Sequence, residues 1–142
     1  MTSEMKRLTI FLLTTLCLLF ASCGNNVEKA RVAFDKGLDL MFRNSKFKEA
    51  EEQFSIAIKY DKANYEAYYY RGCAKFNQKQ YSEAIVDYEK ALELKSDYAD
   101  AEFSLGQVYF ILNDHEMSCY YYKAAKRDGR PNMDDFLKAC PD

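Results

Sequence analysis

The chain has 142 residues and a formal net charge of −2, so it lacks the basic excess that marks proteins that bind nucleic acid. The same near-neutral balance argues against attachment to a membrane surface through charge. Aromatic residues are abundant, with 12 Tyr and 10 Phe, although Trp is absent.

Residues 1–22 have the pattern of a signal peptide rather than of a folded segment. Lys6 and Arg7 precede an apolar run over residues 8–20, which is too short to cross a bilayer comfortably. Ala21 and Ser22 then stand directly before Cys23. This ending resembles the lipobox of bacterial lipoproteins, which implies that Cys23 carries acyl chains and anchors the mature protein to a membrane. An ordinary secretory signal with an incidental Cys is the alternative.

The residues after Cys23 refine this expectation. Residues 23–28 are predicted to be a short polar tether. Gly24, rather than Asp, follows the lipidated Cys, which resembles lipoproteins sorted to the outer membrane. We therefore expect a cell-envelope protein, lipid-anchored in the outer membrane and facing the periplasm.

From about residue 31 the chain repeats with a period of 34 residues, which is typical of a stacked repeat array. Small residues and aromatics recur at fixed positions. The equivalent sets are Gly72, Ala84, Tyr88 and Ala91 in the clearest copy, Gly106, Ser118, Tyr122 and Ala125 in the next, and Ala50, Phe54 and Ala57 in the preceding one.

This pattern resembles the tetratricopeptide repeat (TPR), a helix–turn–helix unit, with Arg71 at a position where Leu is usual. The resemblance implies an all-α solenoid of three repeats over residues 29–131, followed by a capping helix within residues 132–142. The first copy has 13 residues from Gly37 to Ala50, whereas the later copies have 12 between the equivalent positions. Either the first turn carries one extra residue or Leu38 takes the glycine position.

Apolar spacing and stop signals place the helices. One face of each second helix is apolar, and most of the charged residues, Asp87 among them, are expected on the opposite face. The predicted helices cover residues 29–44, 47–60, 64–78, 81–94, 98–112, 115–127 and 132–140.

The TPR resemblance also implies a binding groove, because the first helix of each repeat lines the concave face. The matching positions are Tyr69, Cys73, Phe76 and Asn77 in the second repeat, Phe103, Gln107, Phe110 and Ile111 in the third, and Asp35, Asp39, Phe42 and Arg43 in the first. The groove is expected to be aromatic along two repeats and acidic at one end, which disfavours capture of a carboxylate terminus. The alternative is that these side chains pack against each other or against an inward-folded terminal helix.

Export would place Cys73, Cys119 and Cys140 in an oxidising compartment, where disulfides persist. Cys119 and Cys140 lie at similar distances on either side of the turn at residues 129–131. If the flanking helices pack antiparallel, the two cysteines lie side by side, so we predict a disulfide between them. Two unpaired thiols are the alternative. Cys73 is expected to be a small packed residue or a groove residue.

Motifs for catalysis, metals and cofactors are missing from the sequence. His115 is the single His, and the spacings typical of zinc sites, phosphate loops or nucleophile elbows do not occur. We therefore expect no enzyme, no cofactor and no metal. The predicted function is a protein–protein interaction module at the bacterial cell envelope that binds a peptide or helix of a partner. The alternatives are a permanent structural subunit of an envelope complex and, more remotely, an enzyme of unknown chemistry.

Overall fold

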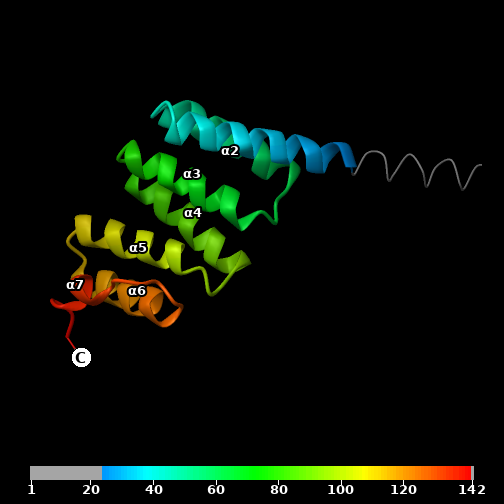
Figure 1. The fold of residues 1–142 in the computed structure, drawn as a ribbon. Helices are drawn as coiled ribbons and strands as arrows, with labels where there is room; N and C mark the ends of the chain where they lie inside the picture. Colours follow the sequence, from blue (N-terminus) through cyan, green and yellow to red (C-terminus); the bar gives the residue numbers. More distant parts are fainter. Residues whose placement is uncertain (1–23, 142) are drawn as a thin grey trace, which may run out of the picture.

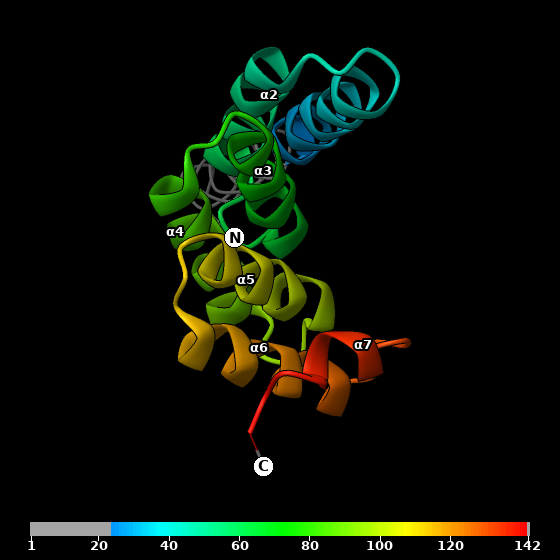
Figure 2. The same ribbon diagram turned by 90° about the vertical axis from the view of Figure 1, so that its left-hand side faces the viewer.

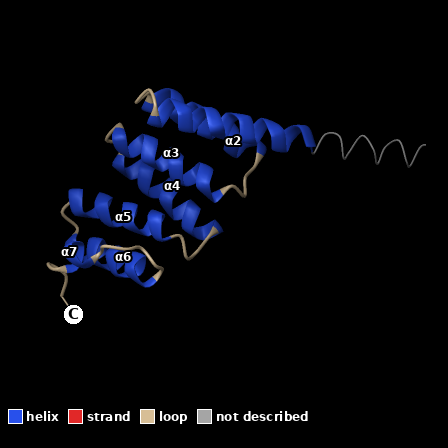
Figure 3. Cartoon of the chain, viewed as in Figure 1, coloured by secondary structure: helices blue, strands red, loops and turns tan. Residues whose placement is uncertain are grey.

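In the computed structural model, which describes residues 24–141, the chain is a stack of antiparallel helices joined by short loops (Figures 1 and 3). No strand occurs within that range. Turning the molecule shows the helix pairs following one another along the array (Figure 2). The predicted all-α solenoid fold is confirmed. The helices are residues 24–42, α2 (Phe47–Tyr60), α3 (Tyr65–Asn77), α4 (Tyr81–Leu94), α5 (Ala99–Ile111), α6 (His115–Arg127) and α7 (Asp134–Leu137).

Side chains at the helix ends explain several of these boundaries. The carboxamide oxygen of Asn64 accepts a hydrogen bond from the Ala67 amide at the start of α3, and Asp114 does the same for Met117 at the start of α6. Gly129 follows α6 with a φ of 97°, a left-handed conformation that glycine adopts without strain. The expected stop after α6 is therefore present.

The first helix begins earlier than expected. Residues 24–28, predicted as a polar tether, are helical and exposed, while Cys23 lies outside the described residues. The exposed Arg31 side chain supports this turn, because it pairs with Glu28 at 2.8 Å and with Asp35 at 3.1 Å along one helix face. The boundary predicted at residue 29 was therefore wrong by one turn or more.

Glycines allow the two helices of each repeat to approach closely. A Cβ atom added at Gly37, Gly72 or Gly106 would lie 2.6 Å, 2.7 Å or 2.5 Å from the ring of Phe54, Tyr88 or Tyr122, respectively. Real Cβ atoms do not tolerate such contacts, so each glycine is required by the ring packed on it. Gly37, and not Leu38, therefore takes the glycine position of the first repeat.

The turn inside each repeat contains one residue in the left-handed conformation. These residues lie 34 positions apart and are Ser45 (φ 52°), Lys79 (φ 63°) and Asn113 (φ 60°). In the second repeat the amide of Gln80 donates to the carbonyl of Lys75, five residues earlier, and the third repeat has the equivalent bond. In the first repeat Lys46 donates to Leu40, six residues earlier. The first turn therefore holds the one extra residue.

Asp87 is buried, contrary to the expectation that it faces solvent. Only 2% of its side chain is exposed. Its two oxygens accept hydrogen bonds from Arg71 at 2.6 and 2.9 Å and from Lys75 at 2.7 Å, and Arg71 also donates to Ser55 on α2 at 3.2 Å. Arg71, at the position where TPR sequences usually carry Leu, thus joins three helices through an ion network. The sequence of α4 alone does not predict that Asp87 is buried, because its partner cations lie on another helix.

The capping helix is much shorter than predicted. Instead of residues 132–140, α7 covers Asp134–Leu137, a single turn. Asn132 has a φ of 57°, which interrupts any helix that would include it, and Pro141 disfavours the helical conformation of Cys140. The C-terminal segment is defined here as residues 133–141. Most of it is therefore an irregular stretch that side-chain contacts hold in place, and not a packed helix.

Candidate functional site

The groove residues at the centre of the array are packed together. The Tyr69 ring lies 5.0 Å from that of Tyr98, 5.1 Å from that of Tyr70 and 5.8 Å from that of Tyr88, measured between ring centroids. Burial raises the pKa of the Tyr69 hydroxyl far above its usual range. Tyr69 is therefore half-buried and packed against the core, as the alternative for the groove residues expects.

Cys73 lies beside this aromatic cluster and is half-buried against the core. The hydroxyl of Tyr88 donates to Cys73 Sγ at 3.6 Å, and burial raises the pKa of the thiol. A thiol in such surroundings is a poor nucleophile. Cys73 is thus a packed residue rather than a groove contact.

The first-repeat end of the concave face is less acidic than the sequence indicated. Asp35 pairs with Arg31 at 3.1 Å and Asp39 pairs with Arg43 at 3.2 Å, so each exposed carboxylate has a cation beside it. Phe42 is 68% exposed and contacts the edge of Tyr70, with 6.0 Å between the ring centroids. This end is open and mixed in charge.

Phe103, a predicted groove residue, is covered by the C-terminal segment. Its ring lies 4.9 Å from that of Phe136 and 5.7 Å from that of Tyr122, and the Arg130 guanidinium lies 3.9 Å from its centroid. Met133, 2% exposed, packs into the same cluster. An inward-folded terminus therefore fills this part of the groove.

A cavity of about 720 Å³ remains between α3, α5, α6 and the C-terminal segment. Four residues predicted at concave positions line it, namely Phe76, Gln107, Phe110 and Ile111. Phe110 is 56% exposed and its ring lies 5.7 Å from that of His115. Asn77 is outside the cavity, and its side chain donates to the Cys73 carbonyl at 2.8 Å. A volume of this size, lined mainly by apolar side chains, suits a few apolar side chains of a partner.

The remaining lining residues were not anticipated. They come from α6 (His115, Ser118, Cys119 and Tyr122) and from the C-terminal segment (Asp135, Phe136, Ala139 and Cys140). The predicted pairing of Cys119 with Cys140 was the one sequence signal that could have located them, because it brings the end of the chain onto α6.

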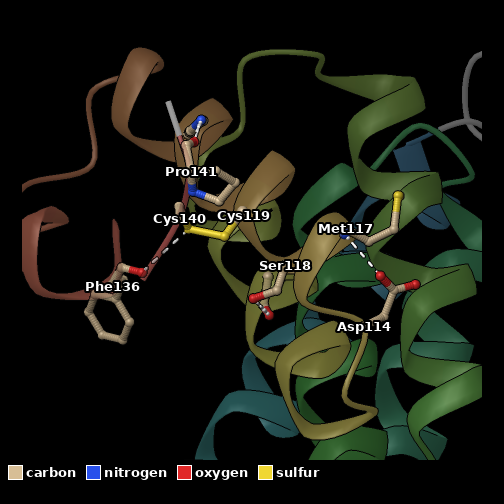
Figure 4. Close-up of a disulfide and its surroundings, with 9 residues drawn as sticks. Asp114, Met117, Ser118, Cys119, Phe136, Cys140 and Pro141 are labelled. Carbon is tan, nitrogen blue, oxygen red and sulfur yellow. Dashed lines mark hydrogen bonds between the residues drawn. A yellow bond between two sulfur atoms is a disulfide. The ribbon is translucent and has the colours of Figure 1, made fainter. Parts of the chain in front are cut away.

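A disulfide joins Cys119 to Cys140 at the wall of the cavity, with 5.5 Å between the Cα atoms (Figure 4). On α6, the hydroxyl of the neighbouring Ser118 donates to the Gly106 carbonyl at 2.9 Å and fixes this helix to α5. On the other side, Cys140 and Pro141 lead away from Phe136 (Figure 4). The disulfide thus ties the end of the chain to a helix that is itself fixed in the array.

Between residues 24 and 141, no helix is long and apolar enough to span a bilayer. Within the same range, no three His, Cys, Asp or Glu side chains are grouped so that they could hold a metal ion.

Comparison with known proteins supports the repeat pattern. Residues 72–112, less than half of the chain, match the family described as TPR repeat. The chain is also 35% identical over 82 residues to the Hsp70-Hsp90 organizing protein of Triticum aestivum, and 36% identical over 77 residues to RNA polymerase II-associated protein 3 of Mus musculus. These matches cover 58% and 54% of this chain but only 14% and 12% of the two curated relatives.

Solved TPR structures have the same fold. The first TPR of Spaghetti (RPAP3), bound to the HSP90 peptide SRMEEVD, superposes with a TM-score of 0.70 at 25% identity, covering 75% of this chain and 83% of that one. MamA superposes with a TM-score of 0.67 at 26% identity, covering 70% of this chain and 58% of that one. The chain therefore has the fold of a TPR solenoid.

Proposed function

We propose that this chain is a non-enzymatic protein–protein interaction module that takes apolar side chains of a partner peptide or helix into the cavity beside α5 and α6. The cavity itself is the observation that carries the proposal, because Phe76, Gln107 and Phe110 line it from the concave positions of two successive repeats. Aromatic side chains on a rigid helix give a large contact area at low entropic cost.

The kind of peptide follows from charge. The first TPR of Spaghetti (RPAP3) is bound to the acidic HSP90 peptide SRMEEVD. The TPR resemblance implies that a chaperone-binding member would carry basic side chains to clamp a terminal carboxylate. The first-repeat positions of this chain carry Asp35 and Asp39 instead. Both are paired with arginines on their own helix, so this end is mixed in charge and not a uniformly basic clamp. We therefore expect an apolar partner segment rather than an acidic C-terminus.

Phe110→Ala tests the site. Phe110 lines the cavity and is more than half exposed, so its truncation should leave the fold intact and weaken partner binding by about 2 kcal/mol, the usual cost at a hot spot. The measurement is binding of a partner captured by the full chain from detergent-solubilised membranes and then purified. Val86→Ala is the matched control, since Val86 is 63% exposed on α4 and lies outside the cavity. Equal losses in both variants would contradict the proposed site.

A permanent structural subunit of an envelope complex remains the second candidate. Phe110, Ile111 and Leu112 are three consecutive apolar residues that are 56%, 43% and 48% exposed, as expected for a surface that a partner always covers. A permanent partner stays bound through a high-salt wash in detergent, whereas a transient peptide partner is released. The same purification therefore separates the two candidates.

The proposed location is the cell envelope, with Cys23 lipidated and the solenoid facing the periplasm from the outer membrane. Its support is the order of Lys6 and Arg7, the apolar run over residues 8–20, and the small residues before Cys23. Cys23→Ala should abolish labelling by a fatty-acid analogue and move the protein out of the membrane fraction. Persistent labelling of this variant would refute the lipid anchor.

A further inference from the structure

We propose that the Cys119–Cys140 disulfide is a redox latch for the cavity: in the oxidised chain it holds the C-terminal segment in place as one wall, and its reduction releases that wall and weakens binding. The inference rests on the proposed function for the site that it regulates, but the movement of the segment is a separate claim.

The first observation is how little else holds the end of the chain. Met133 is buried, and Phe136 packs on Phe103, so the beginning of the segment is fixed by apolar contacts. Beyond Leu137, the side chains of Lys138 and Ala139 are exposed. Lys123 donates to the Pro141 carbonyl at the surface, and such exposed contacts contribute little. The disulfide is therefore the main link between residues 138–141 and α6.

The second observation is that this weakly held part contributes to the cavity wall. Ala139 and Cys140 line the cavity beside Phe136, which is fixed by its contact with Phe103. Without Ala139 and Cys140, the cavity would be more open on the side of the C-terminal segment. A pocket binds small apolar groups well because it surrounds most of their surface, so loss of one wall lowers the affinity.

The chemistry of opening needs a dithiol reductant. One thiolate of the reductant attacks a sulfur of the disulfide and releases the other cysteine as a thiolate, which takes up a proton. The second thiol of the reductant then resolves the mixed disulfide. The products are Cys119 and Cys140 as thiols and the oxidised cyclic reductant, so two electrons and two protons are transferred to the chain.

The third described cysteine does not compete in this exchange. Cys73 is half-buried in α3 and accepts a hydrogen bond from Tyr88, and burial raises the pKa of its thiol, so it is a poor nucleophile. Opening and closing of the latch therefore return to the same pairing among the described residues.

Hydrogen exchange of the full chain in detergent solution tests the movement of the segment. Dithiothreitol should speed amide exchange in residues 137–140 by tenfold or more, with α3 and α4 unchanged. A variant with both Cys119→Ser and Cys140→Ser is the control. It should exchange quickly without the reductant and show no response to it. Unchanged exchange of residues 137–140 after full reduction, verified by mass, would overturn the latch.

Binding of indole tests the cavity itself. Indole is a small apolar probe, and amide NMR shifts of Gln107, Ile111 and Cys119 report its presence at the cavity wall. We expect indole to bind the oxidised chain and the dissociation constant to rise at least fivefold on reduction. Equal or tighter binding to the reduced chain would overturn the role of the segment as a wall. Absence of indole binding to both forms, together with faster exchange on reduction, would refute the proposed binding site and support the movement alone.

Discussion

The second and third repeats join their two helices with opposite chemistry at equivalent positions. Between α3 and α4 the contact is an ion network around a buried carboxylate, and between α5 and α6 it is apolar and aromatic. In the third repeat, the rings of Tyr109 and Tyr121 stack with 5.6 Å between centroids and 7° between planes. The three positions, 34 residues apart, carry Arg71, Lys75 and Asp87 in the second repeat and Leu105, Tyr109 and Tyr121 in the third.

This difference shows which feature the repeat preserves. The glycine against an aromatic ring is the same in both pairs, at Gly72 with Tyr88 and at Gly106 with Tyr122. The three variable positions only need to fill the space beside that contact without leaving a polar atom unpaired. A buried charge network and an apolar cluster satisfy this condition equally, although they respond differently to mutation, salt and pH.

The largest effect is expected from Asp87→Ala. Removal of the carboxylate leaves Arg71 and Lys75 partly buried without a partner, and breaking such a network costs about 3–5 kcal/mol of unfolding free energy. Urea denaturation followed by circular dichroism measures the loss. Glu83→Ala, an exposed acidic residue on the same helix, is the control and should change stability by less than about 0.5 kcal/mol.

Replacing the ion network of the second repeat by the apolar contact of the third tests whether the two are interchangeable. Arg71→Leu, Lys75→Tyr and Asp87→Tyr together install the third-repeat residues in the second repeat. Because apolar replacement of a whole buried ion network is often neutral or stabilising, this triple variant should be much more stable than Asp87→Ala alone. A triple variant as unstable as Asp87→Ala would show that the ionic contact between α3 and α4 cannot be replaced by the apolar contact found between α5 and α6.

Leu105→Ala tests the apolar contact between α5 and α6. It should lower the unfolding free energy by about 3 kcal/mol, within the range for a large-to-small change in a core. Leu105 has no exposed surface, so the truncation leaves a cavity between α5 and α6. Unlike the loss at Asp87, this one should not vary with salt. Denaturation at low and high sodium chloride concentrations compares the two, and a strong salt dependence for Leu105→Ala would contradict the assignment.

A smaller effect, dependent on pH, is expected at Glu102, where the second repeat has Tyr68. Burial and the charge of Asp128 raise the pKa of Glu102 to about 7, and its Oε2 atom has no hydrogen-bond partner within the described structure. The folded chain therefore holds this proton more tightly than the unfolded chain. Its contribution to stability is complete below about pH 4.5 and is lost as the pH rises through about 7.

Glu102→Gln isolates this contribution, because Gln resembles the protonated acid and does not titrate. The variant should match the wild type at pH 4.5 and exceed it in unfolding free energy at pH 8. The lowered pKa of Asp128 acts in the opposite direction, so the difference between variant and wild type is the relevant quantity. A difference that stays constant with pH would show that folding does not raise the pKa of Glu102.

The smallest effect is expected from Tyr109→Leu, which keeps apolar volume and removes the stacked ring. Aromatic pairs contribute about 0.5–1.5 kcal/mol beyond the area that they bury, so the loss should be near 1 kcal/mol. Thermal unfolding with a van't Hoff analysis measures it. Phe76→Leu is a comparison, since the Phe76 ring meets Tyr81 edge-on at 5.7 Å instead of stacking.

Much of the fold could be predicted because its determinants are local. The spacing of Ala84, Tyr88 and Ala91 fixes one face of a helix, and Gly129 with Pro131 ends another. Most predicted helix boundaries therefore agree with the structure to within one or two residues. The burial of Asp87 could not be predicted in this way, since a carboxylate is identified as buried only when its partner cations on a different helix are known.

The groove was predicted less well, because it depends on what packs after each repeat. Tyr69 and Phe103 occupy equivalent positions 34 residues apart. Tyr98, at the start of the next repeat, covers Tyr69, whereas Phe136 from the C-terminal segment covers Phe103. The 34-residue period predicts that Tyr69 and Phe103 occupy equivalent positions, but it does not predict which segment of the chain packs on each of them. The cavity exists because a one-turn helix covers the third repeat less completely than a full repeat would.

The left-handed residues in the turns make the array modular. Residues 80–113 begin just after Lys79 and end at Asn113, so this unit has the same backbone geometry at both of its borders. A second copy inserted after Asn113 would repeat the turn geometry at both borders, but its Asp87 would then face Leu105 and Tyr109 instead of Arg71 and Lys75. Lengthening the solenoid by this unit therefore also requires Asp87→Tyr in the inserted copy, with the C-terminal segment and its disulfide carried unchanged to the new end.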